Sequence, residues 1–361
     1  MMKILVNGRR FDLWETATLT RSIDTNIGAF RFTNSSTVPG KPYPVKVGDY
    51  IYIVVNDERR LTGYVDEISL SSDENSHTIT VSGRDVLADL VDSSVPDSVK
   101  VNEGTISLKK LCENMLNALN MAPFVNEEIK TESFTAEEIQ AAQSGGNAME
   151  FLLSFARKRQ VYLVSNNIRH LVIYRPIRTK SSTPLTRIVG GLVNNVKSSM
   201  MRIANQTRFN KIICKSADNA AVGFDYFGEG EDRSGKAEDD EVRGSRFLEI
   251  QGEESMSDAE CVNRAKEEVN LRRARSKEYV AVVAGLAQSN GTVWDYGQFV
   301  DVNDEYANIQ GKMLIRTVQL NVDIRSGSRA TLTCSQPDAF QVVDAIPLKD
   351  KRISNMGKDI A

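Results

Sequence analysis

The first 95 residues alternate between apolar and polar positions with the two-residue period of β-strands. Turn signals at Gly48 and at Asn56-Asp57 separate these strand patterns, which predicts an antiparallel meander. In residues 50–55 both alternating sets are apolar or aromatic, a pattern typical of a strand covered on both faces. We therefore expect another part of the chain to pack on the outside of this strand.

Between residues 96 and 185 the apolar period changes to that of helices. Leu108, Leu111 and Met115 fall on one helical stripe, and a second helix is predicted to begin near Asn147. A hairpin follows, which predicts a small α/β module. Beyond residue 186 the strand pattern resumes, interrupted by a Gly-rich acidic loop and by a helix with a capping box at Ser257 and Glu260.

Two stretches about 250 residues apart carry the same apolar phase through three successive strands, which indicates an internal duplication. We align Gly48-Asp49-Tyr50 with Gly297-Gln298-Phe299, Val65, Ile68 and Leu70 with Ile315, Val318 and Leu320, Ile79 and Val81 with Leu332 and Cys334, and Asp85 with Asp338.

These patterns predict a mainly β fold with α/β insertions, of the α+β class, containing two similar β-barrels. The predicted domains are a first barrel at 1–95, an α/β module at 96–185, a second barrel at 186–221 and 277–340, an acidic loop and helix at 222–276, and a loosely held tail at 341–361.

Composition narrows the function classes. The chain has 361 residues and a formal net charge of −3, so bulk electrostatics give no reason to expect nucleic-acid binding. No apolar run is long enough to span a bilayer. The four cysteines lie far apart and are expected to be buried thiols, and the two histidines, His77 and His170, to be exposed strand residues. We therefore expect no metal and no cofactor.

Residues 77–94 read as a strand, a glycine and a helix, the order in which many proteins hold phosphate. A phosphate loop requires a Gly-rich turn after a parallel strand, whereas Gly83 stands alone after a meander strand. We expect Gly83 to permit the turn by which the strand leaves the sheet, with Arg84 and Asp85 pairing at that exit. The apolar residues after it, Val86, Leu87 and Leu90, would then dock the next helical turn.

The chain resembles the baseplate hub proteins of contractile-tailed, Mu-like phages, which are related to the late-control D proteins and to the hub part of type VI secretion spike proteins. Two features depart from the family pattern: the acidic loop at 224–244 has no family role, and the second copy lacks the Gly83-Arg84 pair. The resemblance covers nearly the whole chain and rests on residues 14–32, 45–55, 61–68, 77–92, 263–285, 292–304 and 312–320.

The resemblance implies a structural virion protein of the tail baseplate, assembled in the host cytoplasm. In such hubs three chains, each with two tube-like barrels, form a pseudo-sixfold ring that joins the sixfold tail tube to a threefold spike. The implied partners are two further copies, the central spike, the tail tube, the tape-measure protein and other baseplate proteins, with genomic DNA only in transit.

Two sets of residues are candidates for this role. Outward-facing apolar residues are expected at the trimer or barrel interface, and carboxylates on loops and strands are expected to line a channel that does not retain DNA. The interface candidates are Tyr50, Tyr52, Val54 and Phe299, and the channel candidates are Asp66, Glu67, Asp73, Asp304 and Glu305.

Two other functions are considered. A cell-wall hydrolase would need two paired carboxylates, and no spacing singles out a pair, although Glu150 and Glu249 stand in apolar contexts. A nucleic-acid binder would use the basic stretches at 272–277 and 157–159, which lack interleaved aromatic residues. The sequence favours a structural protein over both, and over an enzyme of any class.

Overall fold

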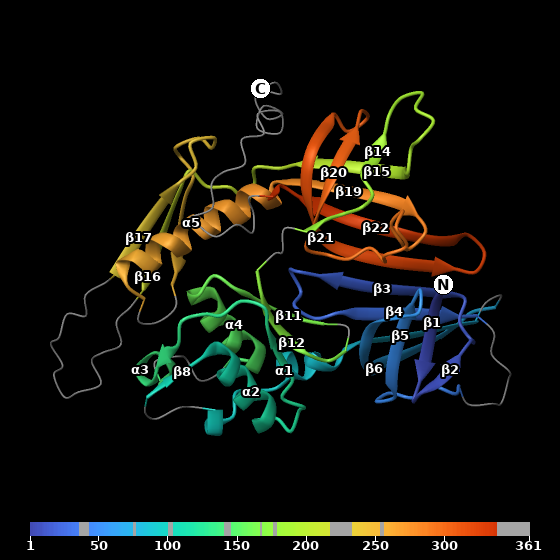
Figure 1. Cartoon of the computed structure of the whole chain (residues 1–361), viewed down its shortest axis with the longest axis horizontal. Coiled ribbons are helices and arrows are strands. Elements are labelled where there is room, and N and C mark those ends of the chain that lie inside the picture. Colours follow the sequence, from blue (N-terminus) through green and yellow to red (C-terminus); the bar gives the residue numbers. More distant parts are fainter. Residues whose placement is uncertain are drawn as a thin grey trace.

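The protein is described from a computed structural model, in which the fold is mostly β-strand (Figure 1). Its largest element is a 14-stranded sheet, and three smaller sheets and five α-helices accompany it in the described part of the chain. The described residues are 1–361 except 36–42, 75–76, 100–103, 141–145, 167, 176–178, 217–232, 253–255 and 338–361.

The amino-terminal strands form the first unit of the large sheet, in the order β3-β4-β7-β6-β5-β1-β2. Alternate side chains of these strands enter one apolar core, as the two-residue period predicts. The strands are β1 (Met2–Val6), β2 (Arg9–Phe11), β3 (Thr16–Ser22), β4 (Ala29–Asn34), β5 (Tyr50–Val55), β6 (Glu58–Ser72) and β7 (His77–Asp85).

The second unit has the order β15-β19-β22-β21-β20, and β13 and β14 pair with β20 at its far side. Its strands are β13 (Thr179–Lys180), β14 (Leu185–Arg187), β15 (Val196–Ile203), β19 (Lys277–Ala284), β20 (Gln298–Asp304), β21 (Ile309–Asp323) and β22 (Gly327–Ser335).

The two units repeat one strand order, because β3-β4-β7-β6-β5 matches β15-β19-β22-β21-β20 position by position. A β-bulge recurs at the matching point: the register shifts between Val65 and Glu67 in β6, and between Ile315 and Thr317 in β21. A shared irregularity 250 residues apart is a stronger mark of duplication than a shared apolar phase, because bulges occur at few positions.

The predicted alignment was wrong in the third strand. Val81 pairs with Ile68 and Leu332 pairs with Val318, so Val81 corresponds to Leu332 and not to Cys334. A shift of two residues preserves the side-chain phase of a strand, so apolar periodicity alone did not reveal the error. Asp338, which we aligned with Asp85, lies outside the described residues.

The two units share one open sheet, because β21 pairs with β3 as well as with β20 and β22. We call the paired strands β3 and β21 the junction (Figure 1). Two closed barrels were expected, but the sheet's described strands do not close on themselves. One core accordingly runs through both units, from Ile4 in β1 to Leu332 in β22.

The α/β module has a separate core and lies beside the first unit (Figure 1). Ser107 and Asn147 cap its two long helices, each side chain accepting a hydrogen bond from the backbone N–H three residues later. Its elements are η1 (Val86–Ala88), α1 (Asp89–Asp92), η2 (Asp97–Val99), β8 (Thr105–Ile106), α2 (Leu108–Ala118), β9 (Val125–Glu127), β10 (Phe134–Thr135), α3 (Ala136–Gln140), α4 (Ala148–Lys158), β11 (Tyr162–Ser165) and β12 (Leu171–Tyr174).

A long helix, α5 (Asp258–Arg275), packs on a three-stranded sheet of β16 (Lys211–Ser216), β17 (Arg233–Glu238) and β18 (Phe247–Gln251). The predicted capping box at Ser257 and Glu260 is confirmed. Residues 233–238 were expected in the acidic loop but form β17, where Gly235 lets the strand approach the backbone of α5. The proposed tail at 341–361 and residues 217–232 of the loop lie outside the described residues.

Candidate assembly interface

The junction is a regular antiparallel pairing between strands about 300 residues apart in sequence. Its register runs from Ser22 opposite Thr317 to Thr16 opposite Asp323. On one face Leu19 and Leu320 are buried opposite each other in the shared core. On the other face the hydroxyl of Thr18 donates a 3.0 Å hydrogen bond to the side-chain oxygen of Asn321. The junction therefore has an apolar face and a polar face.

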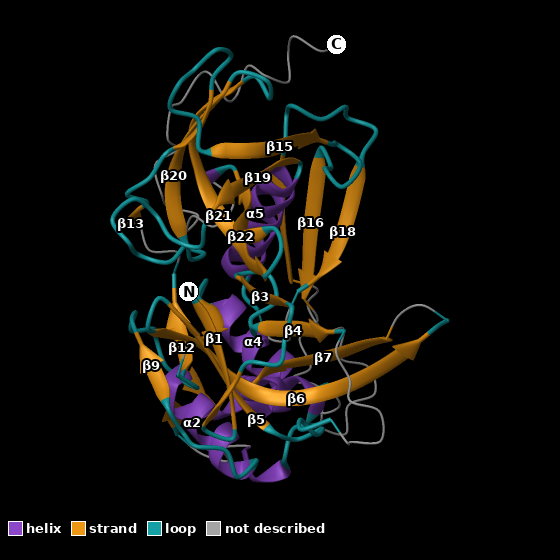
Figure 2. Ribbon diagram, turned by 90° about the vertical axis from the view of Figure 1, so that its right-hand side faces the viewer, coloured by secondary structure: helices purple, strands orange, loops and turns teal. Residues whose placement is uncertain are grey.

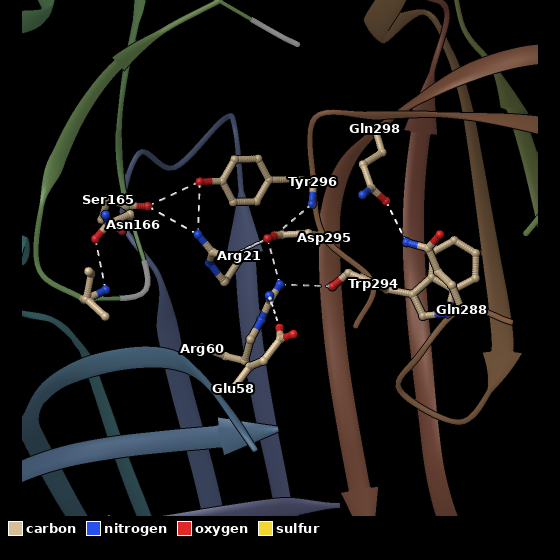
Figure 3. A network of polar contacts seen from close by, with 11 residues as sticks. Arg21, Glu58, Arg60, Ser165, Asn166, Gln288, Trp294, Asp295, Tyr296 and Gln298 are labelled. Atoms are coloured by element: carbon tan, nitrogen blue, oxygen red, sulfur yellow. Dashed lines mark hydrogen bonds and ion pairs between the residues drawn. The ribbon is translucent and has the colours of Figure 1, made fainter. Parts of the chain in front are cut away.

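A polar cluster holds the junction at one end (Figure 3). Arg21 of β3 donates hydrogen bonds of 2.9 and 2.8 Å to both carboxylate oxygens of Asp295, which precedes β20. Arg60 of β6 lies 2.7 Å from the same carboxylate. The side chains of Arg21 and Arg60 are 9% and 6% exposed, so Asp295 compensates two largely buried positive charges. Glu58 lies 3.5 Å from Arg60 as a second, more exposed partner.

The same cluster reaches the α/β module. The hydroxyl of Tyr296 and the guanidinium of Arg21 both donate to the backbone oxygen of Ser165 at the end of β11 (Figure 3). Burial lowers the pKa of Arg21, whereas Asp295, Tyr296 and Asp85 together raise it by a larger amount. The pKa of Arg21 is therefore raised overall, and its side chain stays charged. The cluster thus links both sheet units and the module at one point.

Asp85 is a second buried group at the start of the module. Its carboxylate accepts hydrogen bonds from the backbone N–H of Leu87 at 2.9 Å and from the hydroxyl of Ser165 at 2.5 Å, and it also accepts one from the N–H of Gly28. Burial raises the pKa of Asp85 to about 6, against these hydrogen bonds, which lower it. Asp85 therefore fixes the point at which β7 leaves the sheet.

The predicted turn at Gly83-Arg84-Asp85 was wrong in its details. Gly83 lies inside β7, and a Cβ there would stand 2.0 Å from the backbone oxygen of Tyr64 and 2.6 Å from the ring of Phe30. Glycine is required by close approach and not by a turn. Arg84 pairs with Asp66 and Asp92 at 2.7 Å each and not with Asp85. The expected docking of Val86, Leu87 and Leu90 is confirmed by their burial in the module core.

The apolar interface candidates have partners within the chain. Tyr50 packs against the core of the α/β module, which is the outer cover that its strand pattern predicted. Phe299 packs against Leu314 and Ala274. Tyr52 contacts the ring of Tyr50 and lies under the Arg59 guanidinium, and Val54 is half-buried. Their role between subunits remains a prediction, and their burial is explained without it.

The carboxylate candidates are not equivalent. Asp304 is fully buried, accepts a 2.8 Å hydrogen bond from the Tyr279 hydroxyl, and cannot face a channel. Asp66 is exposed and paired with Arg84, and Glu305 accepts a 2.7 Å hydrogen bond from the N–H of Val189. Glu67 and Asp73 are exposed at the far half of the β6–β7 hairpin. Their place on a channel remains a prediction.

Two edges of the large sheet have no described strand beside them. β15 pairs with β19 only. β6 pairs with β5 through residues 58–64, but no described strand pairs with the same side of residues 67–72. Figure 2 shows this half of β6 projecting from the body with β7. We call residues 67–72 the β6 edge and residues 198–203 the β15 edge.

The basic stretches have partners within the chain. Arg272 lies 2.7 Å from Glu268, Arg273 lies 2.8 Å from Asp239, and Arg275 lies 3.2 Å from Asp24. In the described residues no group of three or more His, Cys, Asp or Glu side chains is arranged to hold a metal ion, and no described helix is long and apolar enough to cross a membrane. All four cysteines are free and buried, as predicted.

Comparison with known proteins defines the class. Residues 1–85 match the family described as Mu phage baseplate assembly protein GpP-like, N-terminal, and residues 257–343 match the fourth domain of Mu phage baseplate assembly protein GpP. These segments hold most of the two sheet units. Each sheet unit therefore contains a segment that matches a domain of the Mu phage baseplate assembly proteins.

Full-length relatives narrow this class. The chain is 26% identical over 369 residues to the baseplate hub protein gp44 of Escherichia phage Mu, covering 98% of this chain and 91% of that protein. The 43 kDa tail protein of prophage MuSo2 from Shewanella oneidensis superposes with a TM-score of 0.76 at 26% identity, covering 94% of this chain and 99% of that one. A tail protein from Neisseria meningitidis MC58 superposes with a TM-score of 0.78 at 15% identity, covering 94% and 97%.

These relatives confirm the resemblance to the baseplate hub proteins of Mu-like phages. The chain has a baseplate hub or tail function of that kind, and its relatives are structural tail proteins. Sequence reasoning missed the polar cluster, although a signal was present. Arg21 shares the strand phase of Ala17 and Leu19, so a charge was already placed at a core position.

Proposed function

We propose that three copies of this chain form a ring whose six sheet units imitate one layer of the sixfold tail tube. The ring joins that tube to a threefold central spike and leaves a passage for genomic DNA. The observation that carries the proposal is the repeated strand order of the two units, including the matching bulge. Two similar units in each of three chains provide six near-equivalent positions.

Similarity to a baseplate hub protein supports a proposal about the other binding partners. We propose that the tail tube and the tape-measure protein bind on one side of the ring, that the spike binds on the other, and that further baseplate proteins surround it. Assembly then takes place in the host cytoplasm before the virion is complete. In this proposal the units are tube-like, and three chains together close the barrel that each chain leaves open.

We propose that the polar face of the junction lines the passage. It continues across both units and carries mainly hydroxyl groups, together with Arg31, Arg84 and Arg329. Hydroxyl groups bind phosphate less strongly than an excess of cations would. Glu67 lies on this face, because it pairs with Ser82 of β7. Other members of this face are Thr16, Thr18, Thr20, Thr33, Thr80, Ser82, Thr317, Gln319, Asn321, Thr331 and Thr333.

The experiment is a measurement of mass in solution by light scattering, for the chain alone and for the chain co-expressed with its spike protein. The expected mass of the hub component is three times the 40.1 kDa of one chain. A hub that stays monomeric at micromolar concentration, both alone and with the spike, would contradict the proposal. Unpaired edges of this length otherwise favour association.

A further inference from the structure

The junction provides a template for a contact that the single chain leaves unmade. Because β6 corresponds to β21 and β15 corresponds to β3, the in-chain pair β21–β3 has a counterpart, β6–β15, whose two members are both open edges. We propose that the β6 edge of one subunit pairs with the β15 edge of the next in an antiparallel register set by the junction. This inference rests on the ring proposed above and specifies its subunit contact.

The register follows from the pairings within the chain. Ile68 opposite Val81 matches Val318 opposite Leu332, which places Leu70 at the position of Leu320. The neighbouring strands β7, β4 and β3 match β22, β19 and β15 in the same way, which places Met201 at the position of Leu19. Since Leu320 faces Leu19 in the junction, Leu70 faces Met201 of the next subunit.

Exposure of the side chains agrees with this register. Leu70 is 70% exposed, whereas its counterpart Leu320 is 2% exposed. Ile203, which the register places opposite Ile68, is 39% exposed on the same face. Apolar side chains that stand on the core side of a sheet and remain in water indicate a missing neighbour.

The partner is a second copy of this chain, because both halves of the contact occur in one molecule. The two edges differ, so the contact is heterologous and generates a ring or a filament, but not an isologous dimer. The in-chain junction already shows that these two kinds of strand fit each other with a buried apolar face. A ring removes both open edges, which a monomer would otherwise present to other chains.

The first test introduces one cysteine on each edge. In the proposed register Ser71 faces Met200, the counterpart of the pair Asn321 and Thr18, whose side chains touch. The double variant S71C/M200C, oxidised with oxidised glutathione, is expected to give covalent species of two and three chains on a non-reducing gel. The four natural cysteines are fully buried and contribute no background. Variant T18C/N321C is the matched control, forming its disulfide within one chain.

The second test removes the apolar contact. Variant L70D is expected to raise the concentration for half-maximal association about tenfold or more. The control L13D changes a leucine that is 53% exposed away from both edges and is expected to leave association unchanged.

The two proposals fail in different ways. A trimer that forms normally in L70D, and in which S71C/M200C gives no covalent species, overturns the strand contact and leaves the ring standing. A wild-type chain that does not associate, alone or with the spike, overturns both.

Discussion

At the residue scale, charged and polar groups in core positions determine how the parts of this molecule meet. Arg21 and Asp85 each continue an apolar strand phase and each end in the contact between the sheet and the α/β module. A buried polar group is stable only when it is hydrogen-bonded, so both residues fix a geometry that apolar packing alone leaves free.

Asp85 should make stability depend on pH. The pKa of Asp85 rises from 3.8 to about 6 on folding. Its contribution to the free energy of unfolding is therefore fully present below about pH 4 and is lost as the pH rises through about 6. The shift corresponds to about 3 kcal/mol. We expect D85N to gain stability relative to wild type between pH 4 and pH 7, measured by urea unfolding. The control is D97N, at an exposed aspartate, which should leave the pH dependence of stability unchanged. A stability profile of D85N that runs parallel to that of the wild type over this pH range would contradict the assignment.

Gly83 should tolerate no side chain. A Cβ there would overlap the backbone oxygen of Tyr64 and the Phe30 ring, so β6 or β4 must move. We expect G83A to lose about 1–3 kcal/mol, the usual cost of overpacking, in chemical denaturation. G146A is the control, because a Cβ at Gly146 meets no atom within 4 Å. Similar losses in both variants would show that the general effect of replacing glycine with alanine, and not close approach, sets the loss of stability.

At the scale of elements, the loop before β20 holds two strands of the first unit in place through Asp295. Asp295 compensates Arg21 of β3 and Arg60 of β6, which belong to different parts of the first unit. Its removal leaves two largely buried cations without that carboxylate.

We expect D295N to lose about 3 kcal/mol of unfolding free energy, because breaking a buried ion pair leaves an uncompensated charge. The control D301N breaks the pair with Lys180, whose side chain is 62% exposed, and should lose less than about 1 kcal/mol. Urea unfolding at neutral pH measures both. Equal losses in the two variants would show that burial of the arginines contributes little.

Local elements were the most predictable part of the fold. The caps at Asn147 and Ser257 follow from the side chain at the helix start, and the meander of β5–β7 follows from its two-residue period. Strand pairing between distant segments was not predictable, because the partner of β3 lies about 300 residues away and period-two patterns match many strands. For the same reason the alignment slipped by two residues at Val81.

The sequence indicated which side chains are buried more reliably than it indicated what covers them. The double-sided apolar pattern of β5 required an outer cover, but the pattern does not say whether the cover comes from the same chain. Tyr50 and Phe299 find theirs within the chain. Asp304 was predicted on a channel because it is acidic. It lies two residues after Val302, on the buried face of β20, and this position already argued against exposure. Leu70 was aligned with Leu320 correctly, but only the structure shows that one is exposed and the other buried.

At the scale of the whole molecule, the chain contains one complete contact between sheet units and the two halves of another. The junction joins the first unit to the second, and the β6 and β15 edges repeat its two sides without partners in the described chain. A heterologous contact of this kind is satisfied only by other copies, which is why the monomer is expected to be an intermediate of assembly.

The most direct test of the proposed ring is an electron cryo-microscopy reconstruction of the purified hub bound to its spike. We expect three chains around one axis, with six sheet units at near-equivalent positions and β6 of each subunit beside β15 of the next. A reconstruction in which the amino-terminal and carboxy-terminal units occupy unrelated positions, or in which the number of chains is not three, would contradict it.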